Sequence, residues 1–440
     1  METFSGEGRL RWGACRASGG IGRGCPPARN TATAIRIRGL LAAPRLETTP
    51  TAAATTENAI VNRQEEVELK RGLRGVYLDT TESSNVIGDV GRLIYRGYDI
   101  HDLAERSTFE EAVYLLLNGR LPTQAQLDAF NTQLKAASAL PAPLLDIIDR
   151  IKHAHPMDVL RTAVSALSAF VPDADDASHE AALRKGVELT AQATAIVAAH
   201  HRIRTGQPVL APDPSLNHAG NFLYMLLGER PDEDTTRLMD KDFIVHLDHG
   251  SNASSFAARV TASTLADIHC CVASGIATLK GPLHGGAAEG VMKMALEIGE
   301  ESNVDAYLEQ KRADRERIMG FGHAVYKAED PRARHLREGS RLLAEKSGDP
   351  KWFRILSKVE ERMAPYAERG ICVNVDFWSG SVYYLLGIPE DLFVSIFALA
   401  RIPGYVAQVL EQQDRNILIR PLMHYVGPMD LEYTPIEQRG

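Results

Sequence analysis

Apolar residues recur at helical spacing along almost the whole chain from about residue 61 onward. A representative segment follows Thr108, which precedes two acidic residues and an apolar face at positions 112, 113, 115 and 116. Similar patterns, mostly separated by Gly or Pro, predict helices over residues 144–154, 158–170, 180–205, 219–227, 235–246, 252–279, 286–299, 304–312, 331–346, 350–368, 379–386 and 391–412. The pattern therefore predicts an all-α protein.

Short apolar alternations broken by Gly and Asn occupy the stretch from Gly75 to Gly97. They predict one or two small strands or hairpins before the helices begin. We find no repeat with a period of about 20–50 residues, so the sequence does not favour a solenoid.

Composition is that of an ordinary globular protein, with 44% hydrophobic and 24% charged residues among 440. The formal net charge of -8 argues against a nucleic-acid partner or an anionic-membrane partner. No uninterrupted apolar run reaches the ~18 residues that a membrane-spanning helix needs. The five cysteines include no Cys-x-x-Cys pair, which disfavours a disulfide framework or a thiolate zinc site and favours a reducing compartment.

The first 46 residues differ from the rest, because they hold eight Arg, two Glu and no Lys among many small residues. Such a segment cannot bury a core, and we expect residues 1–60 to be a disordered N-terminal extension. An Arg-rich, acid-poor segment resembles an organelle transit peptide, which would place the protein in the mitochondrial matrix. We favour the other interpretation, in which this segment is a dispensable extension of a cytoplasmic protein.

His284 is the first candidate for chemistry, because it lies between Pro282 and a Gly pair, just before a predicted helix. A helix N-terminus lowers the pKa of an imidazole and keeps it neutral, so that it donates a hydrogen bond to a developing oxyanion. A histidine that only caps or packs at a tight turn is the alternative.

His323 follows Gly320-Phe-Gly322, where the backbone can approach a ligand closely. Asp330-Pro-Arg332 reads as the cap and first turn of a helix, and Arg332 would then direct its guanidinium towards the His323 loop to bind a carboxylate. A surface salt bridge for Arg332 is the alternative. The full GxGxxG fingerprint of a dinucleotide site is absent.

Asp376 is enclosed by apolar neighbours at positions 373, 375, 377 and 378. Burial in such surroundings raises the pKa of a carboxylate and suits it to remove a proton from carbon. The alternative is an N-cap for a helix that begins near Ser379.

His246, Asp248 and His249 suggest a second hypothesis, a metal-dependent hydrolase. Two histidines three residues apart are weak evidence without a third ligand nearby, and the HExxH pattern is missing. Arg401 lies in the last apolar helix and Arg420 follows its end. Taken alone, each would be interpreted as a solvent-exposed charge.

Taken together and in order, these segments resemble citrate synthase, in particular the shorter bacterial type shared with 2-methylcitrate synthase. The resemblance runs from about Gly72 to Pro428. It is carried by Leu93-Ile-Tyr-Arg-Gly-Tyr-Asp-Ile100, His249-Gly-Ser-Asn-Ala-Ser254, Gly281-Pro-Leu-His-Gly-Gly286, Met319-Gly-Phe-Gly-His323, Asp330-Pro-Arg332 and Asn374-Val-Asp376.

The resemblance implies an acyltransferase that condenses acetyl-CoA with oxaloacetate and then hydrolyses the thioester, with 2-methylcitrate synthesis from propionyl-CoA as the alternative. It implies His284, His323 and Asp376 as catalytic residues. Oxaloacetate would be bound by His249, Arg332, Arg401 and Arg420, with Arg420 reaching the site of the partner subunit in a homodimer. Coenzyme A would meet Arg317, Ile318, Met319, Gly320 and Phe321.

The resemblance also implies two helical domains, a large one over residues 61–283 and 389–440 and a small one over residues 284–388. No metal and no cofactor is expected, since the coenzyme A thioester is a substrate. A helical binding scaffold without catalysis is the third hypothesis, and the presence of three candidate catalytic groups and three arginines disfavours it.

Overall fold

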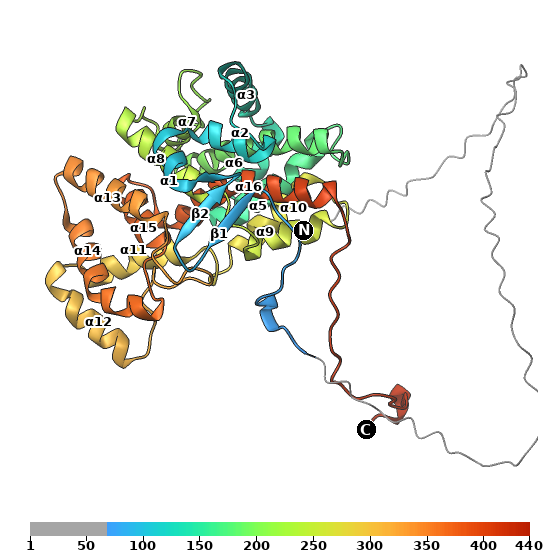
Figure 1. Ribbon diagram of the computed structural model, residues 1–440. Coiled ribbons are helices and arrows are strands. Elements are labelled where there is room, and N and C mark those ends of the chain that lie inside the picture. The colour runs from blue at the N-terminus through green and yellow to red at the C-terminus, as the bar shows by residue number, and fades with distance from the viewer. Residues whose placement is uncertain (1–67) are drawn as a thin grey trace, which may run out of the picture. The chain divides into compact units, whose positions relative to one another are not determined.

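The computed structural model describes residues 68–440, and helices dominate them (Figure 1). The predicted extension over residues 1–60 lies outside this part of the chain. The helices are α1 (Ile100–Arg106), α2 (Phe109–Asn118), α3 (Gln124–Ala137), α4 (Ala142–Arg150), α5 (Pro156–Leu167), α6 (His179–Arg204), α7 (His218–Leu227), α8 (Glu233–His246), α9 (Ala253–Ala262), α10 (Ile268–Leu279), α11 (Ala287–Ile298), α12 (Val304–Ala313), α13 (Ala333–Ser347), α14 (Lys351–Met363), α15 (Asp376–Leu385) and α16 (Phe393–Asp414). The prediction of an all-α protein is confirmed.

A small antiparallel sheet precedes the helices. Its strands are β1 (Ser84–Ile87), β2 (Arg92–Tyr95) and β3 (Tyr98–Asp99), in the order β1-β2-β3. Ser84 pairs with Tyr95, and Ile94 pairs with Asp99. The predicted small strands are therefore present, although the segment before Ser83 forms none.

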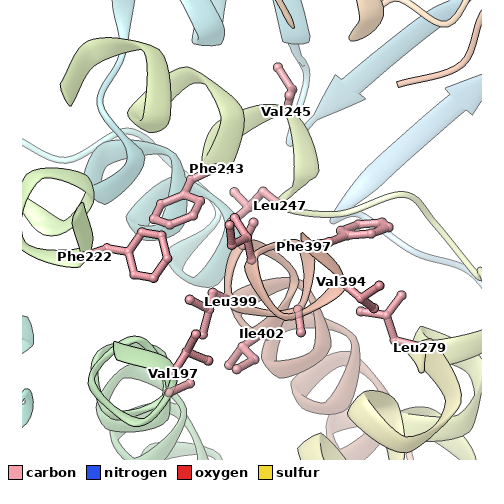
Figure 2. Packing of buried hydrophobic residues seen from close by; sticks show 14 of the residues in the cluster. Val197, Phe222, Phe243, Val245, Leu247, Leu279, Val394, Phe397, Leu399 and Ile402 are labelled. Carbon is pink, nitrogen blue, oxygen red and sulfur yellow. The ribbon is translucent and has the colours of Figure 1, made fainter. Parts of the chain in front are cut away.

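The core is built around α16, the most buried long helix of the described chain. Figure 2 shows Leu399 and Ile402 of α16 beside Val197 of α6, and Phe243 of α8 against Phe222 of α7, whose ring centroids are 5.7 Å apart. The helix is long and apolar enough to cross a membrane by length and composition, yet its apolar window is entirely buried inside the protein. We therefore interpret α16 as a core helix.

A second group of helices, α11 to α15, packs together beside this core (Figure 1). Within the group α15 lies against both α11 and α13, and Gly380 of α15 is needed there because a Cβ would stand 2.5 Å from the carbonyl oxygen of Ala288. The division into a large domain (61–283 and 389–440) and a small domain (284–388) stays a prediction.

Several helix boundaries differ from the predicted ones. The single helix expected over residues 252–279 is interrupted, because Leu265 adopts a positive φ of 64° and the Asp267 side chain caps a new helix, α10. Helix α15 begins at Asp376 itself, three residues before the expected start. The pattern also missed α1 and α3, which are short or largely polar.

Candidate active site

The loop after α8 is fixed to the sheet and to α16 by Asp248. Its buried carboxylate accepts a hydrogen bond of 2.5 Å from the Ser84 hydroxyl and one of 3.2 Å from the Gln408 amide. The Tyr95 hydroxyl donates to the Asp248 carbonyl oxygen at 2.9 Å. These bonds hold the next residue, His249, in one place.

His249, His323 and Tyr326 form a compact aromatic cluster. The Nε2 atom of His249 lies 3.1 Å from the Tyr326 hydroxyl, and the two imidazole rings lie 5.1 Å apart, edge to face. Tyr326 stacks on His323 with centroids 4.7 Å apart. The structure therefore brings two of the predicted site histidines together, although 73 positions separate them in the sequence.

Local backbone groups fix the tautomer of His323. The N–H groups of Val325 and Tyr326 both donate to its Nδ1 atom, each at 3.0 Å. A nitrogen that accepts cannot also carry a proton, so the proton of the neutral ring is on Nε2. Burial and the nearby Arg332 lower the pKa of His323 to about 4, which keeps the ring neutral at pH 7.

The His323 loop pairs with the segment that leads into Asp376. Phe321 and Val373 form an antiparallel bridge, the Asn374 N–H donates to the Gly320 carbonyl at 2.9 Å, and the Gly322 N–H donates to the Cys372 carbonyl at 2.8 Å. Only Gly fits at position 320, because φ is +78° and a Cβ would stand 2.7 Å from the Phe377 ring. Two distant segments thus lie side by side.

Asp376 opens α15, where its carboxylate retains part of its exposure to solvent. Within residues 68–440 this carboxylate accepts no hydrogen bond. Asp376 is therefore not the N-cap that we considered as the alternative, because an N-cap side chain accepts from a backbone N–H. Burial raises its pKa to about 6, and the positive charges of Arg332 and Arg401 oppose that rise. The group is therefore a stronger base than an ordinary aspartate, and it is still ionised at pH 7.

His284 lies in the turn before α11, but its ring is held by the N-terminus of a different helix, α9. The backbone N–H of Ser254 donates to Nε2 at 3.3 Å, and the Ser254 hydroxyl lies 2.8 Å from the same atom. The proton of the ring is therefore on Nδ1. Burial and then the charge of Arg401 lower the pKa of His284 to about 4. His284 is therefore neutral, as we expected. The cause is burial and the charge of Arg401, whereas we had expected the N-terminus of the helix that follows it.

Arg332 is buried, and Asp330 holds its guanidinium. Nε and Nη2 of Arg332 donate to the two carboxylate oxygens of Asp330 at 2.9 and 2.6 Å, and Asp330 also accepts from the Val375 N–H at 3.3 Å. Helix α13 begins at Ala333, and its N-cap position is Arg332. We expected Asp330 to cap this helix, but its side chain holds the Arg332 guanidinium instead. Nη1 takes part in no hydrogen bond within residues 68–440, which leaves its two N–H groups for a ligand.

Arg401 is a buried cation on α16. Its Nε donates to the His246 carbonyl at 2.6 Å, and its guanidinium carbon lies 4.9 Å from the centroid of the Phe397 ring. Nη2 is buried and has no hydrogen-bond partner in the described chain. A buried donor without a partner is costly, so this atom is well placed to bind an acceptor on a ligand.

Of the remaining predicted residues, Gly320 and Phe321 pair with the Asp376 segment as described above, whereas Arg317 and Arg420 are exposed. Arg420 lies in the exposed segment after α16 and makes no hydrogen bond or ion pair within residues 68–440. Arg317 is exposed, Ile318, Met319 and Phe321 are half-buried, and Gly320 is buried behind Phe377. Their predicted contact with coenzyme A stays a prediction.

The residues of the metal-site hypothesis have other partners. Nδ1 of His246 lies 2.9 Å from the Asp242 carbonyl oxygen, and Asp248 and His249 make the bonds described above. Within residues 68–440, no group of three or more His, Cys, Asp or Glu is arranged to hold a metal ion. The hydrolase hypothesis therefore gains no support from the described chain.

Sequence reasoning did not predict the roles of three residues of the cluster, namely Ser254, Tyr326 and Asp330. Ser254 ends one of the segments that carry the resemblance, Asp330 was expected only as a helix cap, and Tyr326 lies three residues after His323. Ser254 would have been identified by its position in the first turn of a helix, where the N–H groups are free to donate. The contacts of Tyr326 and Asp330 depend on tertiary packing, and no local signal reports them.

The fold and the site together define a mainly helical protein in which neutral imidazoles and buried guanidiniums share one region with a carboxylate of raised pKa, Asp376. The family model described as the C-terminal domain of citrate synthase matches residues 72–422. The citrate synthase of Haloferax volcanii is 46% identical over 84% of this chain and 99% of its own length, and the 2-methylcitrate synthase 1 of Corynebacterium glutamicum is 40% identical over 84% and 99%.

Citrate synthase of Thermoplasma acidophilum, solved as a ternary complex with carboxymethyl coenzyme A and oxaloacetate, superposes with a TM-score of 0.81. It is 30% identical and covers 84% of this chain and all of that structure. The chain belongs to the citrate synthase family. It is an acyltransferase of the class that converts the acyl group into an alkyl group on transfer.

Proposed function

We propose that the protein condenses acetyl-CoA with oxaloacetate and water to give citrate and coenzyme A. The observation that carries this proposal is the continuous set of contacts from His284 through Ser254 and the His249 loop to His323, and from there to the segment of Asp376. These contacts supply a base for carbon and two neutral hydrogen-bond donors in one region.

In the first step, the Asp376 carboxylate takes a proton from the methyl carbon of the thioester. The electrons of the broken C–H bond move towards the thioester oxygen, and the Nδ1–H of His284 donates a hydrogen bond to that oxygen. Because the pKa of Asp376 is about 6, it is both more basic than usual and ionised at neutral pH. A neutral imidazole stabilises the enol or enolate without being deprotonated itself.

In the second step, the enol carbon attacks the keto carbon of oxaloacetate. The keto oxygen gains a negative charge as the new carbon–carbon bond forms, and the Nε2–H of His323 donates its proton to that oxygen. The proton that Asp376 removed from the methyl carbon then returns to the His323 ring through water, which restores both groups. Water then hydrolyses the thioester of the condensed product, which releases citrate and coenzyme A. Closure of the helix groups before the first step would exclude bulk water from the enolate.

Oxaloacetate is a dianion, and the open donors of the cluster suit it. Nη1 of Arg332 and Nη2 of Arg401 are both available, and His249 lies beside them. Charged donors that act together orient a dicarboxylate and select it over monoacids. The predicted fourth contact, Arg420, needs a second copy of the chain.

A homodimer is supported by the segment that carries Arg420. This segment extends from the end of α16, and Figure 1 shows it running away from the helices. It exposes apolar side chains at Ile417, Leu418, Leu422, Met423, Val426 and Leu431. So many exposed apolar residues are typical of a segment that packs against a partner.

The acyl group of the substrate has two candidates. One methylene changes binding in an apolar pocket by only ~1–3 kcal/mol, so propionyl-CoA is the second candidate, as in the 2-methylcitrate synthases described above. We expect coenzyme A at Arg317, Ile318, Met319, Gly320 and Phe321, no cofactor, and a cytoplasmic location, since the relatives are archaeal and bacterial.

The test is release of free thiol from acetyl-CoA and, separately, from propionyl-CoA, with and without oxaloacetate. We expect oxaloacetate-dependent release with a higher kcat/KM for acetyl-CoA. A higher value for propionyl-CoA would assign 2-methylcitrate synthesis instead. Thiol release from neither substrate would refute both.

A further inference from the structure

Two histidines away from the candidate site contact each other directly. Nδ1 of His101, on α1, lies 2.9 Å from Nε2 of His335, on α13. Nδ1 of His335 lies 3.0 Å from Glu105, whose second oxygen accepts from Lys241 of α8 at 2.7 Å. We call His101, His335, Glu105 and Lys241 the α1–α13 clasp.

The direction of every hydrogen bond in the clasp follows from the charge state of Glu105. Lys241 and burial act on Glu105 in opposite senses, and the net effect is a pKa below the ordinary value, so the carboxylate is ionised and can only accept. His335 therefore carries its proton on Nδ1 and accepts at Nε2, which requires His101 to donate from Nδ1. Burial and His101 lower the pKa of His335 to about 4, so this neutral arrangement holds at pH 7.

The clasp lies next to Arg332 along the chain and in space. His335 is in the first turn of α13, and its backbone N–H donates to the Arg332 carbonyl oxygen at 3.2 Å. On the other side, Asp330 ties the Arg332 guanidinium to the N–H of Val375. The start of α13 is therefore held between the Asp376 segment and α1.

Helix α1 in turn continues directly from the sheet that fixes the His249 loop. Asp99 of β3 caps α1 by accepting from the His101 N–H at 3.0 Å, and Ser84 of β1 donates to Asp248 and accepts from the Gly250 N–H at 3.0 Å. The clasp thus connects the start of α13, next to Arg332, to α1 by side chains, and α1 continues from the sheet that fixes the His249 loop.

We propose that His101 and His335 are positioning residues, which hold Arg332 at the spacing from His249 that oxaloacetate binding requires. This inference rests on the proposed function, because it assigns Arg332 and His249 to oxaloacetate. It predicts a loss of oxaloacetate affinity when the bond between the two histidines is removed, with the chemistry and the acyl-CoA site left unchanged.

The experiment compares two substitutions of the half-exposed His101 in the full-length protein. In His101→Asn the side-chain amide nitrogen takes the place of Nδ1 and donates to His335, whereas His101→Leu cannot donate. Losing one such bond should weaken oxaloacetate binding, measured by calorimetry, by about three- to tenfold in the Leu variant. Both kcat and the KM for acetyl-CoA should stay within about twofold of wild type in the same variant.

The matched control is His179→Leu, which removes an exposed histidine that contacts Asp414 at 2.8 Å. It should leave oxaloacetate binding unchanged, and His101→Asn should bind as the wild type does. Equal losses in the Leu and Asn variants, or a Leu variant that binds oxaloacetate normally, would overturn the positioning role.

Failure of the clasp and failure of the proposed function give different results. A wild type that binds oxaloacetate but releases no thiol refutes the proposed function, while the comparison of variants by calorimetry still decides the clasp. A wild type that does not bind oxaloacetate refutes both. A fall in kcat and a rise in both KM values together in His101→Leu would indicate a general structural role and also overturn the proposal.

Discussion

Asp376→Asn should lower turnover by orders of magnitude and at the same time stabilise the protein above pH 6. The substitution keeps the shape of the side chain and removes the negative charge that burial disfavours. In the wild type that charge is tolerated although no hydrogen bond within residues 68–440 stabilises it, and its pKa is raised from 3.8 to about 6. A base that is costly to ionise is useful for removing a proton from carbon, and it weakens the fold.

The sign of the pH dependence follows from the raised pKa. The folded protein holds this proton more tightly than the unfolded chain, so ionisation of Asp376 favours unfolding. The penalty is absent below the unfolded value near pH 3.8, grows between that pH and 6, and is complete above pH 6. A shift of about two units corresponds to roughly 3 kcal/mol as an upper bound, and partial exposure reduces it to about 1–3 kcal/mol.

Urea unfolding of wild type and Asp376→Asn at pH 5 and pH 8 measures this difference. We expect the variant to be more stable by about 1–3 kcal/mol at pH 8 and by about half as much at pH 5. Thiol release by the variant should fall by about 10²–10⁴-fold, and the wild-type kcat/KM should fall about tenfold per pH unit below pH 6.

Asp146→Asn, which changes an exposed carboxylate on α4, is the control for the loss of one charge. It should change neither turnover nor the stability difference between the two pH values. An Asp376→Asn protein that is less stable than wild type at pH 8, or one that keeps a near-wild-type rate, would refute the assignment of Asp376 as a desolvated base.

Three further outcomes are expected. Ser254→Ala should lower kcat by about tenfold in the thiol-release assay, because His284 loses one of the two groups that orient its Nε2 atom, and an unchanged kcat would count against that orientation. Arg401→Leu should raise the KM for oxaloacetate more than the KM for acetyl-CoA, and equal increases would contradict the role of its free Nη2. Deletion of residues 1–46 should leave both activity and melting temperature unchanged, and a large loss of either would show that the extension is structural.

The helices were predictable where one face alone is apolar, as in α2, because the 3.6-residue period is then visible in the sequence. The break between α9 and α10 was not, since the apolar pattern continues through it and the chain turns at a non-glycine residue, Leu265. The start of α15 was placed three residues late, because we expected Asp376 to precede the helix, whereas it is the first helical residue.

The histidines, Arg332 and Asp376 were predictable in kind, since each stands in a Gly-rich or polar segment between predicted helices, whereas Arg401 lies inside α16 and was indicated only by the resemblance. Their partners were not. The contact of Tyr326 with His249 and the pairing of Phe321 with Val373 each join segments more than fifty residues apart, and only the packed structure defines them. We predicted that the N-terminus of the next helix along the chain would act on the His284 ring. The ring is instead held by the N-terminus of the earlier helix α9.

The two candidate acid groups of the site carry their protons on opposite ring nitrogens, and this follows from backbone donors alone. His323 accepts at Nδ1 from two N–H groups of its own loop, and His284 accepts at Nε2 from the first turn of α9. Because both acceptors face N–H groups that cannot be deprotonated, neither ring can change its tautomer without breaking these bonds. The chemistry therefore depends on how three loops are folded more than on any charged neighbour, which is why the sequence alone indicates the residues but not the direction in which each donates.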